Sequence, residues 1–203
     1  MTREQLAAHV YRAAHRTGRF RLRSGVESSE YFDKYRFESD PSLLREICAA
    51  LLPSVPPGVH MLAGLELGGV PLATVLGQMS GLPVVFVRKR AKEYGTRQLA
   101  EGAPVSGHKL IVIEDVVTSG GQIAQSVQDL RSLGAVVEDA LCVIDRANGR
   151  ETLSAAGINL TALFCYADFP LSQNQTDVIA LSGSSDSSRS TGPAEAGHYV
   201  RWR

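Results

Sequence analysis

The chain has 203 residues, of which 44% are hydrophobic and 6% aromatic, and its 21 Lys+Arg balance 21 Asp+Glu. This length suits one α/β domain with its own hydrophobic core, and zero net charge argues against a general nucleic-acid binder. Its apolar stretches fall far short of the ~20 residues that a membrane span needs, and the N-terminus lacks the apolar core of a secretory signal. Three widely spaced cysteines (Cys48, Cys142 and Cys165) are typical of thiols in a reducing compartment. We therefore expect a cytoplasmic α/β enzyme or binding domain with no membrane or nucleic-acid partner.

The first part of the chain predicts two helices on either side of an extended region. Thr2 and Gln5 fit a capping box, and apolar residues at helical spacing carry the helix to about Ala14. Alternating charged and apolar residues predict a strand over 19–23, and another extended segment begins at 31–32. A second helix starts at 40–41, where a capping aspartate is followed by proline at the first helical position, and ends within 53–58.

From residue 60 the pattern repeats as strand, loop and helix. Strands are predicted at 60–63, 83–87, 110–113, 135–144 and 160–164, and helices at 71–79 and 122–133. This alternation predicts a parallel sheet covered by helices on both faces. Ten of the twelve residues 182–193 are Ser, Thr, Gly or Pro, too few apolar groups to offset ordering entropy. We therefore expect a folded domain over 1–172 and a disordered tail over 173–203.

The most informative segment is an apolar strand that runs into two carboxylates, a small-residue loop and a helix. Its sequence is Ile111-Val112-Ile113-Glu114-Asp115-Val116-Val117-Thr118-Ser119-Gly120-Gly121-Gln122. Ligands of open parallel sheets lie at the carboxyl ends of the strands, and the first amides of a helix, which have no partner within it, bind phosphate. Two carboxylates before such a cradle suit a sugar phosphate, whose vicinal hydroxyls they can bind. The alternative interpretation is an ordinary turn after an acidic strand end.

This segment resembles the signature of the type I phosphoribosyltransferases, in which two acidic residues precede a Thr/Ser/Gly-rich loop. The resemblance implies the type I phosphoribosyltransferase fold, a parallel sheet flanked by helices with a small N-terminal hood and a flexible catalytic loop. It also implies phosphoribosyl pyrophosphate (PRPP) as the ligand, with its ribose hydroxyls on Glu114 and Asp115. The residues implied for its 5-phosphate are Val116, Val117, Thr118, Ser119, Gly120, Gly121 and Gln122.

A second segment concentrates positive charge, because residues 88–97 hold five basic residues and one acid. A solvated surface loop is the plain interpretation, and a mobile loop that covers pyrophosphate is the functional one. The loop resembles the catalytic loop of the orotate phosphoribosyltransferase family, with Tyr94 where histidine is common, a change that removes a cation near neutral pH. The resemblance implies that Arg88, Lys89 and Lys92 are catalytic and bind PRPP. It also implies a homodimer in which this loop enters the neighbouring subunit's active site.

The same family matches at further positions on the ligand side. Arg146, directly after a predicted strand, and Thr118 are implied to contact orotate. The aromatic pair Tyr31 and Phe32 is also implied to contact orotate. Packing in the hydrophobic core is an equally good interpretation of these two residues.

Two departures concern PRPP binding. Arg23 stands where the family has a PRPP-binding lysine, so charge is kept and geometry is changed. Gly68 and Gly69 lie in a segment that matches the family's pyrophosphate loop, with Gly68 in place of a lysine. The five histidines show no metal-ligand spacing, so the expected cofactor is Mg²⁺ carried by PRPP, with no protein-held metal.

The resemblance covers about residues 1–169 and implies a reaction of UMP biosynthesis. The 5-phosphoribosyl group of PRPP would pass to orotate, giving orotidine 5'-phosphate and pyrophosphate. Two alternatives stay open at this point: a phosphoribosyltransferase for another base, and a non-catalytic regulator of the same fold that senses PRPP. Pyrophosphate release with a panel of bases distinguishes the first, and nucleic-acid binding without turnover distinguishes the second.

Overall fold

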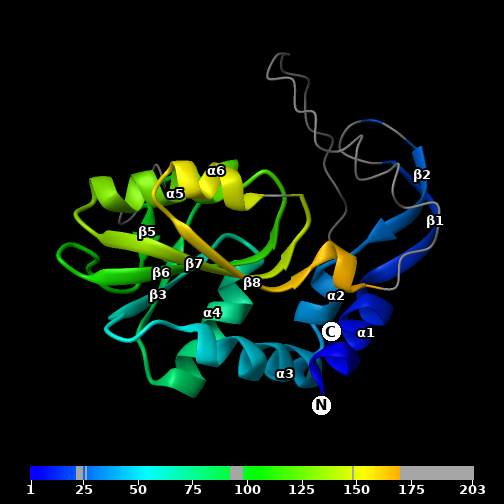
Figure 1. Cartoon of the computed structure of the whole chain (residues 1–203). Coiled ribbons are helices and arrows are strands. Elements are labelled where there is room, and N and C mark those ends of the chain that lie inside the picture. The colour runs from blue at the N-terminus through cyan, green and yellow to red at the C-terminus, as the bar shows by residue number, and fades with distance from the viewer. Residues whose placement is uncertain (22–24, 26, 92–97, 148, 170–203) are drawn as a thin grey trace, which may run out of the picture.

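The protein is built around a six-stranded sheet, and the computed structural model describes residues 1–21, 25, 27–91, 98–147 and 149–169 (Figure 1). The strand order is β5-β4-β3-β6-β7-β8. Five strands are parallel, and the short edge strand β5 (Ala100–Glu101) runs antiparallel to β4. The parallel strands are β3 (Met61–Leu65), β4 (Val84–Val87), β6 (Lys109–Val117), β7 (Val136–Asp145) and β8 (Asn159–Cys165). The predicted α/β fold is confirmed.

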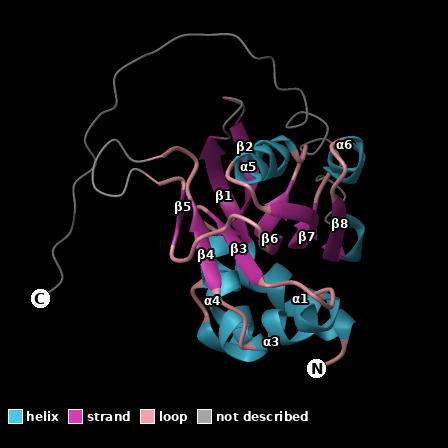
Figure 2. Cartoon of the chain, turned by 90° about the vertical axis from the view of Figure 1, so that its left-hand side faces the viewer, coloured by secondary structure: helices cyan, strands magenta, loops and turns pink. Residues whose placement is uncertain are grey.

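Helices cover both faces of this sheet (Figures 1 and 2). On one face lie α5 (Gly121–Ser132) and α6 (Gly149–Ala155), and on the other lie α1 (Arg3–Ala14), α3 (Pro41–Leu51) and α4 (Gly69–Ser80). Buried apolar residues accordingly form two clusters. All five residues of β3 are buried, as expected for a central strand of a covered parallel sheet. No helix among the described residues is long and apolar enough to cross a membrane.

A small N-terminal hood stands beside the sheet. It consists of the antiparallel pair β1 (His15–Arg21) and β2 (Glu27–Phe32), which is not hydrogen-bonded to the main sheet, and the single-turn helix α2 (Tyr35–Glu38). The predicted capping box of Thr2 and Gln5 is present at the start of α1. An ion pair of 2.7 Å between Arg3 Nη2 and Asp168 Oδ2 connects α1 to the segment that follows β8.

Several element boundaries differ from the prediction. β6 extends to Val117, because its valines continue the pairing with β7, so the acidic pair lies inside the strand and not at its end. The segment 31–32 ends β2 and does not begin a new strand. α4 starts at Gly69, two residues before the expected proline. The sequence missed α2, α6 and β5, which are too short to show a periodic pattern. The predicted tail lies outside the described residues.

Candidate functional site

The carboxyl ends of four neighbouring parallel strands bring the predicted site segments to one edge of the sheet. Main-chain hydrogen bonds join these segments. The Glu66 N–H donates to the Val87 carbonyl over 2.8 Å, and the Arg146 N–H donates to the Val117 carbonyl over 2.8 Å. The Lys89 N–H donates to Glu66 Oε2 over 3.0 Å. The segments after β3, β4, β6 and β7 therefore form one continuous edge, as the positions of these residues in the sequence predicted.

The acidic pair is held by β6 itself. Glu114 is 8% exposed and Asp115 is fully buried, and Glu114 pairs with Cys142 of β7 in the sheet register. The Asp115 N–H donates to Glu114 Oε1 over 3.2 Å, and the Val116 N–H donates to Asp115 Oδ1 over 2.5 Å. Because strand pairing fixes the backbone on which both carboxyl groups stand, a loop movement does not displace them.

The hood adds two ionisable side chains that the sequence did not predict. Lys34 immediately precedes α2, and its Nζ lies 2.6 Å from Asp115 Oδ2. Glu38, the last residue of α2, is 8% exposed and also contacts Asp115. The two residues are four apart, so one helical turn presents both to the same partner. In the sequence this spacing is indistinguishable from an ordinary solvated ion pair, because only the fold places Asp115 opposite α2.

The groups of this cluster shift one another's pKa values in opposite directions. Burial and the neighbouring Asp115 raise the pKa of Glu38 to about 9, and they also raise the pKa of Glu114 well above its ordinary value. Burial opposes ionisation of Asp115, but hydrogen bonds from Glu114, Glu38 and Lys34 outweigh it and lower the pKa of Asp115. Burial also disfavours the Lys34 ammonium, but Asp115 outweighs it and raises the pKa of Lys34. Near neutral pH the Lys34 ammonium is therefore paired with the Asp115 carboxylate beside a protonated Glu38, and the raised pKa of Glu114 favours its neutral form.

The loop after β3 reaches the acidic pair because two of its residues have no side chain. A Cβ at Gly68 would overlap the carboxylate of Asp115, and a Cβ at Gly69 would overlap the carbonyl oxygen of Ile113. Gly68 has an ordinary right-handed backbone with φ −67°, so the close approach and not the backbone conformation requires glycine there. The predicted pyrophosphate loop is therefore packed directly against the predicted ribose-binding residues.

The loop after β6 forms the predicted phosphate cradle. Gly120 has φ +77° and precedes α5, and no side chain of the described chain caps this helix end. Thr118 and Ser119 are exposed beside it. A Cβ at Gly120 would lie 2.8 Å from the Gly149 carbonyl, so the turn that starts α6 shapes the cradle through backbone contact. The loop is shorter than predicted, because Val116 and Val117 belong to the strand.

The predicted base-binding residues fall into different environments. Arg146 is half-buried directly after β7, at the ligand edge. Tyr31 is 45% exposed and stacks on Phe20 with ring centroids 5.4 Å apart. Phe32 is half-buried, and its ring lies 6.5 Å from that of Phe37 in the core. Successive strand residues face opposite sides, so the two aromatic rings do not share one surface.

The predicted basic loop is only partly described. Arg88 is half-buried after β4, and Lys89 is exposed. The predicted residues Arg23 and Lys92, and Tyr94, lie outside the described residues.

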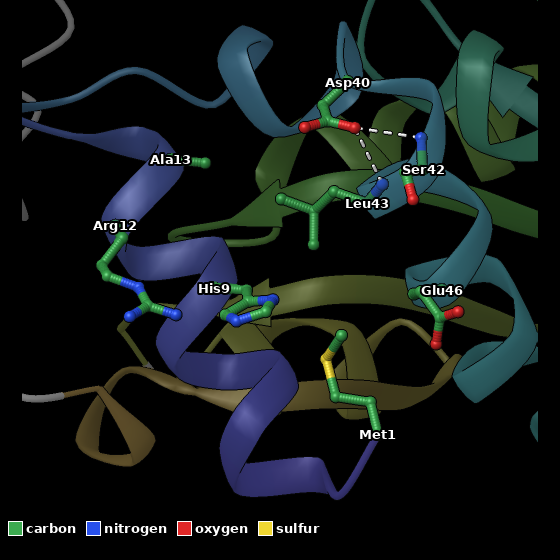
Figure 3. A pocket seen from close by; sticks show the side chains of 8 residues that line it. All are labelled: Met1, His9, Arg12, Ala13, Asp40, Ser42, Leu43 and Glu46. Carbon is green, nitrogen blue, oxygen red and sulfur yellow. Dashed lines mark hydrogen bonds between the residues drawn. The ribbon is translucent and has the colours of Figure 1, made fainter.

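Away from this edge the described residues offer no metal site, but they do form a hollow. Within the described residues, no group of three or more His, Cys, Asp and Glu is arranged to hold a metal ion. A hollow of about 310 Å³ lies between α1 and α3 (Figure 3). Its lining residues are Met1, His9, Arg12, Ala13, Asp40, Ser42, Leu43 and Glu46. Asp40 accepts hydrogen bonds there from the backbone N–H groups of Ser42 and Leu43, so its carboxylate serves as a helix cap.

Comparison with known proteins finds relatives over most of the chain, although no protein-family model matches it. Orotate phosphoribosyltransferase of Nocardioides sp. is 44% identical over 164 residues, which cover 80% of this chain and 92% of that protein. The enzyme of the same name from Methanocella arvoryzae is 42% identical over 147 residues, or 72% of this chain and 84% of that protein. The solved orotate phosphoribosyltransferase of Mycobacterium tuberculosis in complex with PRPP is 28% identical, with a TM-score of 0.71 and coverage of 83% and 99%. That of Aeropyrum pernix is 30% identical, with a TM-score of 0.66 and coverage of 82% and 95%.

Proposed function

Because this chain belongs to the orotate phosphoribosyltransferase family, we propose that it transfers the 5-phosphoribosyl group of PRPP to orotate. The products are orotidine 5'-phosphate and pyrophosphate, a step of UMP biosynthesis. The observation that carries the proposal is the buried pair Glu114 and Asp115, followed after one short loop by the uncapped N-terminus of α5.

The sugar phosphate binds along β6 and its loop. Vicinal ribose hydroxyls donate to the ionised Asp115 and to the carboxyl oxygens of Glu114. The backbone amides of 119–122 donate to the 5-phosphate, favoured by the positive end of the helix dipole. Glycine at 120 and 121 lets the phosphate approach the main chain.

The base binds on the side of β7, where the guanidinium of Arg146 suits a carboxylated pyrimidine. Thr118 completes the orotate contacts together with Tyr31, which has the more exposed ring of the two hood aromatic residues, whereas the ring of Phe32 packs toward Phe37. In the reaction N1 of orotate attacks C1 of the ribose and releases its proton to water, while the C1–oxygen bond to pyrophosphate breaks and positive charge develops at C1. Fixed positioning and neutralisation of charge supply most of the rate enhancement.

Cations stabilise the departing pyrophosphate. We assign this role to Arg88, Lys89 and Lys92, with Arg23 and the backbone of Gly68–Gly69 also binding PRPP. Mg²⁺ bound to the diphosphate would neutralise part of its charge. The diphosphate oxygens themselves are the hard donors that Mg²⁺ prefers, so the ion would arrive with the substrate.

The experiment that tests this function is an assay of pyrophosphate release with PRPP, Mg²⁺ and each of a panel of bases. We expect release with orotate and none above background with uracil, adenine or hypoxanthine. Release with a purine and not with orotate would contradict the proposal and support the alternative base.

We further propose that the protein acts in the cytoplasm as a homodimer in which loop 88–97 completes the neighbouring active site. The support is the resemblance of that loop to the family's catalytic loop. Lys92→Ala and Arg146→Ala should each abolish most activity, and a mixture of the two should regain it, because one hybrid site then has both residues intact. An inactive mixture, with exchange of subunits verified by sedimentation of tagged chains, would exclude loop exchange.

A further inference from the structure

Lys34 occupies a position between the hood and the acidic pair that the proposed mechanism does not use. Its Nζ lies 2.6 Å from Asp115 Oδ2, and its side chain is 33% exposed while that of Asp115 is fully buried. The ammonium also lies 5.4 Å from the centre of the Tyr35 ring. A lysine in this setting compensates a buried charge and still reaches solvent.

The oxygen that Lys34 binds is also the atom closest to the glycine loop. Asp115 Oδ2 is the atom that a Cβ at Gly68 would meet first, so the carboxylate stands between Lys34 and the loop after β3. One end of this carboxylate is fixed by the Val116 N–H, which donates to Oδ1. Without Lys34 the other oxygen would lose the cation that fixes its orientation.

Lys34 has hydrogen-bond donors left over that a ligand can use. An ammonium has three N–H donors, of which the ion pair with Asp115 needs one. One third of the side chain is exposed, and its partner atom Asp115 Oδ2 lies where the segment after β3 comes closest to β6. A phosphate oxygen bound on the glycine loop would therefore lie beside this ammonium.

We propose that Lys34 is a further residue of the PRPP site, which holds the Asp115 carboxylate in place for the ribose and donates a hydrogen bond to the diphosphate. The inference rests on the proposed function and adds a residue that the sequence resemblance does not assign. It adds a residue next to α2 to the PRPP contact that Arg23 is proposed to supply.

The test compares Lys34→Met with Lys109→Met. Lys109 is a matched control, because its Nζ forms a 2.9 Å ion pair with Glu138 Oε2 and its side chain is 32% exposed, but it lies at the opposite end of β6. We expect Lys34→Met to raise KM for PRPP by about tenfold or more, the effect of one charge-assisted hydrogen bond, with a smaller change in kcat. Lys34→Arg should recover part of the loss, and Lys109→Met should behave as the wild type.

A purely structural role for Lys34 gives a different result. Loss of folded protein lowers the activity per milligram and leaves KM unchanged. An unchanged KM for PRPP in Lys34→Met therefore overturns the inference, whatever the change in Tm. If Lys34→Met does not fold, Lys34→Gln, which keeps a donor for Asp115, should still raise KM, and an unchanged KM there also overturns it. Should the wild type not use orotate, the function fails separately, and calorimetric binding of PRPP to the same variants still decides the role of Lys34.

Discussion

Gly68 illustrates how one missing side chain organises the site. The family resemblance predicts that glycine at this position loses the basic contact of a lysine. The structure shows that the missing Cβ leaves the space that the Asp115 carboxylate fills. The adjacent Gly69 has a different reason for being glycine, because its neighbour is the main-chain carbonyl of Ile113. A side chain can move aside and a sheet carbonyl cannot, so the two glycines should respond differently to substitution.

We predict that Gly68→Ala raises KM for PRPP by at least tenfold and changes Tm by only a few degrees, because Asp115 must leave its position. Gly69→Ala should instead destabilise the fold by about 2 kcal/mol or more, as overpacking against backbone does. Steady-state kinetics and thermal unfolding of both variants check this. Equal effects of the two substitutions on Tm would contradict it.

Glu38 makes stability depend on pH. Its pKa is about 9 in the folded protein against an ordinary value of 4.5, so its stabilising contribution is complete below pH 4.5 and is lost as the pH rises through 9. Glu38→Gln should therefore gain free energy of unfolding relative to the wild type as the pH rises from 5.5 to 8.5. Urea denaturation at several pH values measures this difference.

The matched control for that experiment is Glu138→Gln. Glu138 lies on β7 beside Lys109, which lowers its pKa, so its contribution is fully present above the ordinary pKa of a glutamate and stays constant over this range. A difference that grows equally in both variants would show that Glu38 is not the titrating group.

At the scale of elements, length determined what the sequence could predict. Helices α1 and α3 and the long strand β7 carry capping residues or apolar patterns over many positions, and all were predicted. Single-turn α2 and two-residue β5 have no such pattern, and α2 is the element that brings Lys34 and Glu38 to Asp115. The acidic pair was predictable because it is local in sequence, but its partners come from a contact about 80 residues away in the chain, which only tertiary packing creates.

Arg131 connects three elements beneath the functional edge. From the end of α5 its guanidinium donates to the Val137 carbonyl over 2.6 and 3.0 Å, and to the carbonyls of Ala156 and Gly157 over 3.0 and 2.9 Å. It thus joins α5 to β7 and to the turn between α6 and β8.

We predict that Arg131→Met lowers the free energy of unfolding by about 2 kcal/mol, because a hydrogen bond to a charged group contributes ~1.5–3 kcal/mol net of exchange with water and this guanidinium is exposed. Gln125→Ala on the same helix removes only a 3.0 Å bond to Asp129 Oδ1 and should cost less than about 0.5 kcal/mol. Urea unfolding compares the two. A similar loss in both would contradict the structural role of Arg131, and KM for PRPP should change in neither.

At the scale of the whole molecule, the first and last described elements are joined. Arg3 pairs with Asp168, and Phe169 is 3% exposed against the core. We predict that a chain ending at residue 172 keeps the Tm and orotate turnover of the full chain, whereas one ending at residue 162 does not fold, since it loses the last three of the seven residues of β8 and both of these contacts. Circular dichroism and the pyrophosphate assay on both truncations decide where the domain ends.

The main-chain contacts between the segments that follow β6 and β7 determine which ligands fit the site. The Arg146 N–H is bonded to Val117, and Gly149 packs against Gly120, so the base side and the phosphate side share one rigid backbone. Their separation is thus fixed by geometry that side-chain variation does not alter. We expect the site to select ligands by the distance between base and phosphate. It should bind a base and a phosphate that are one ribose apart and reject longer or shorter nucleotide analogues whatever their charge.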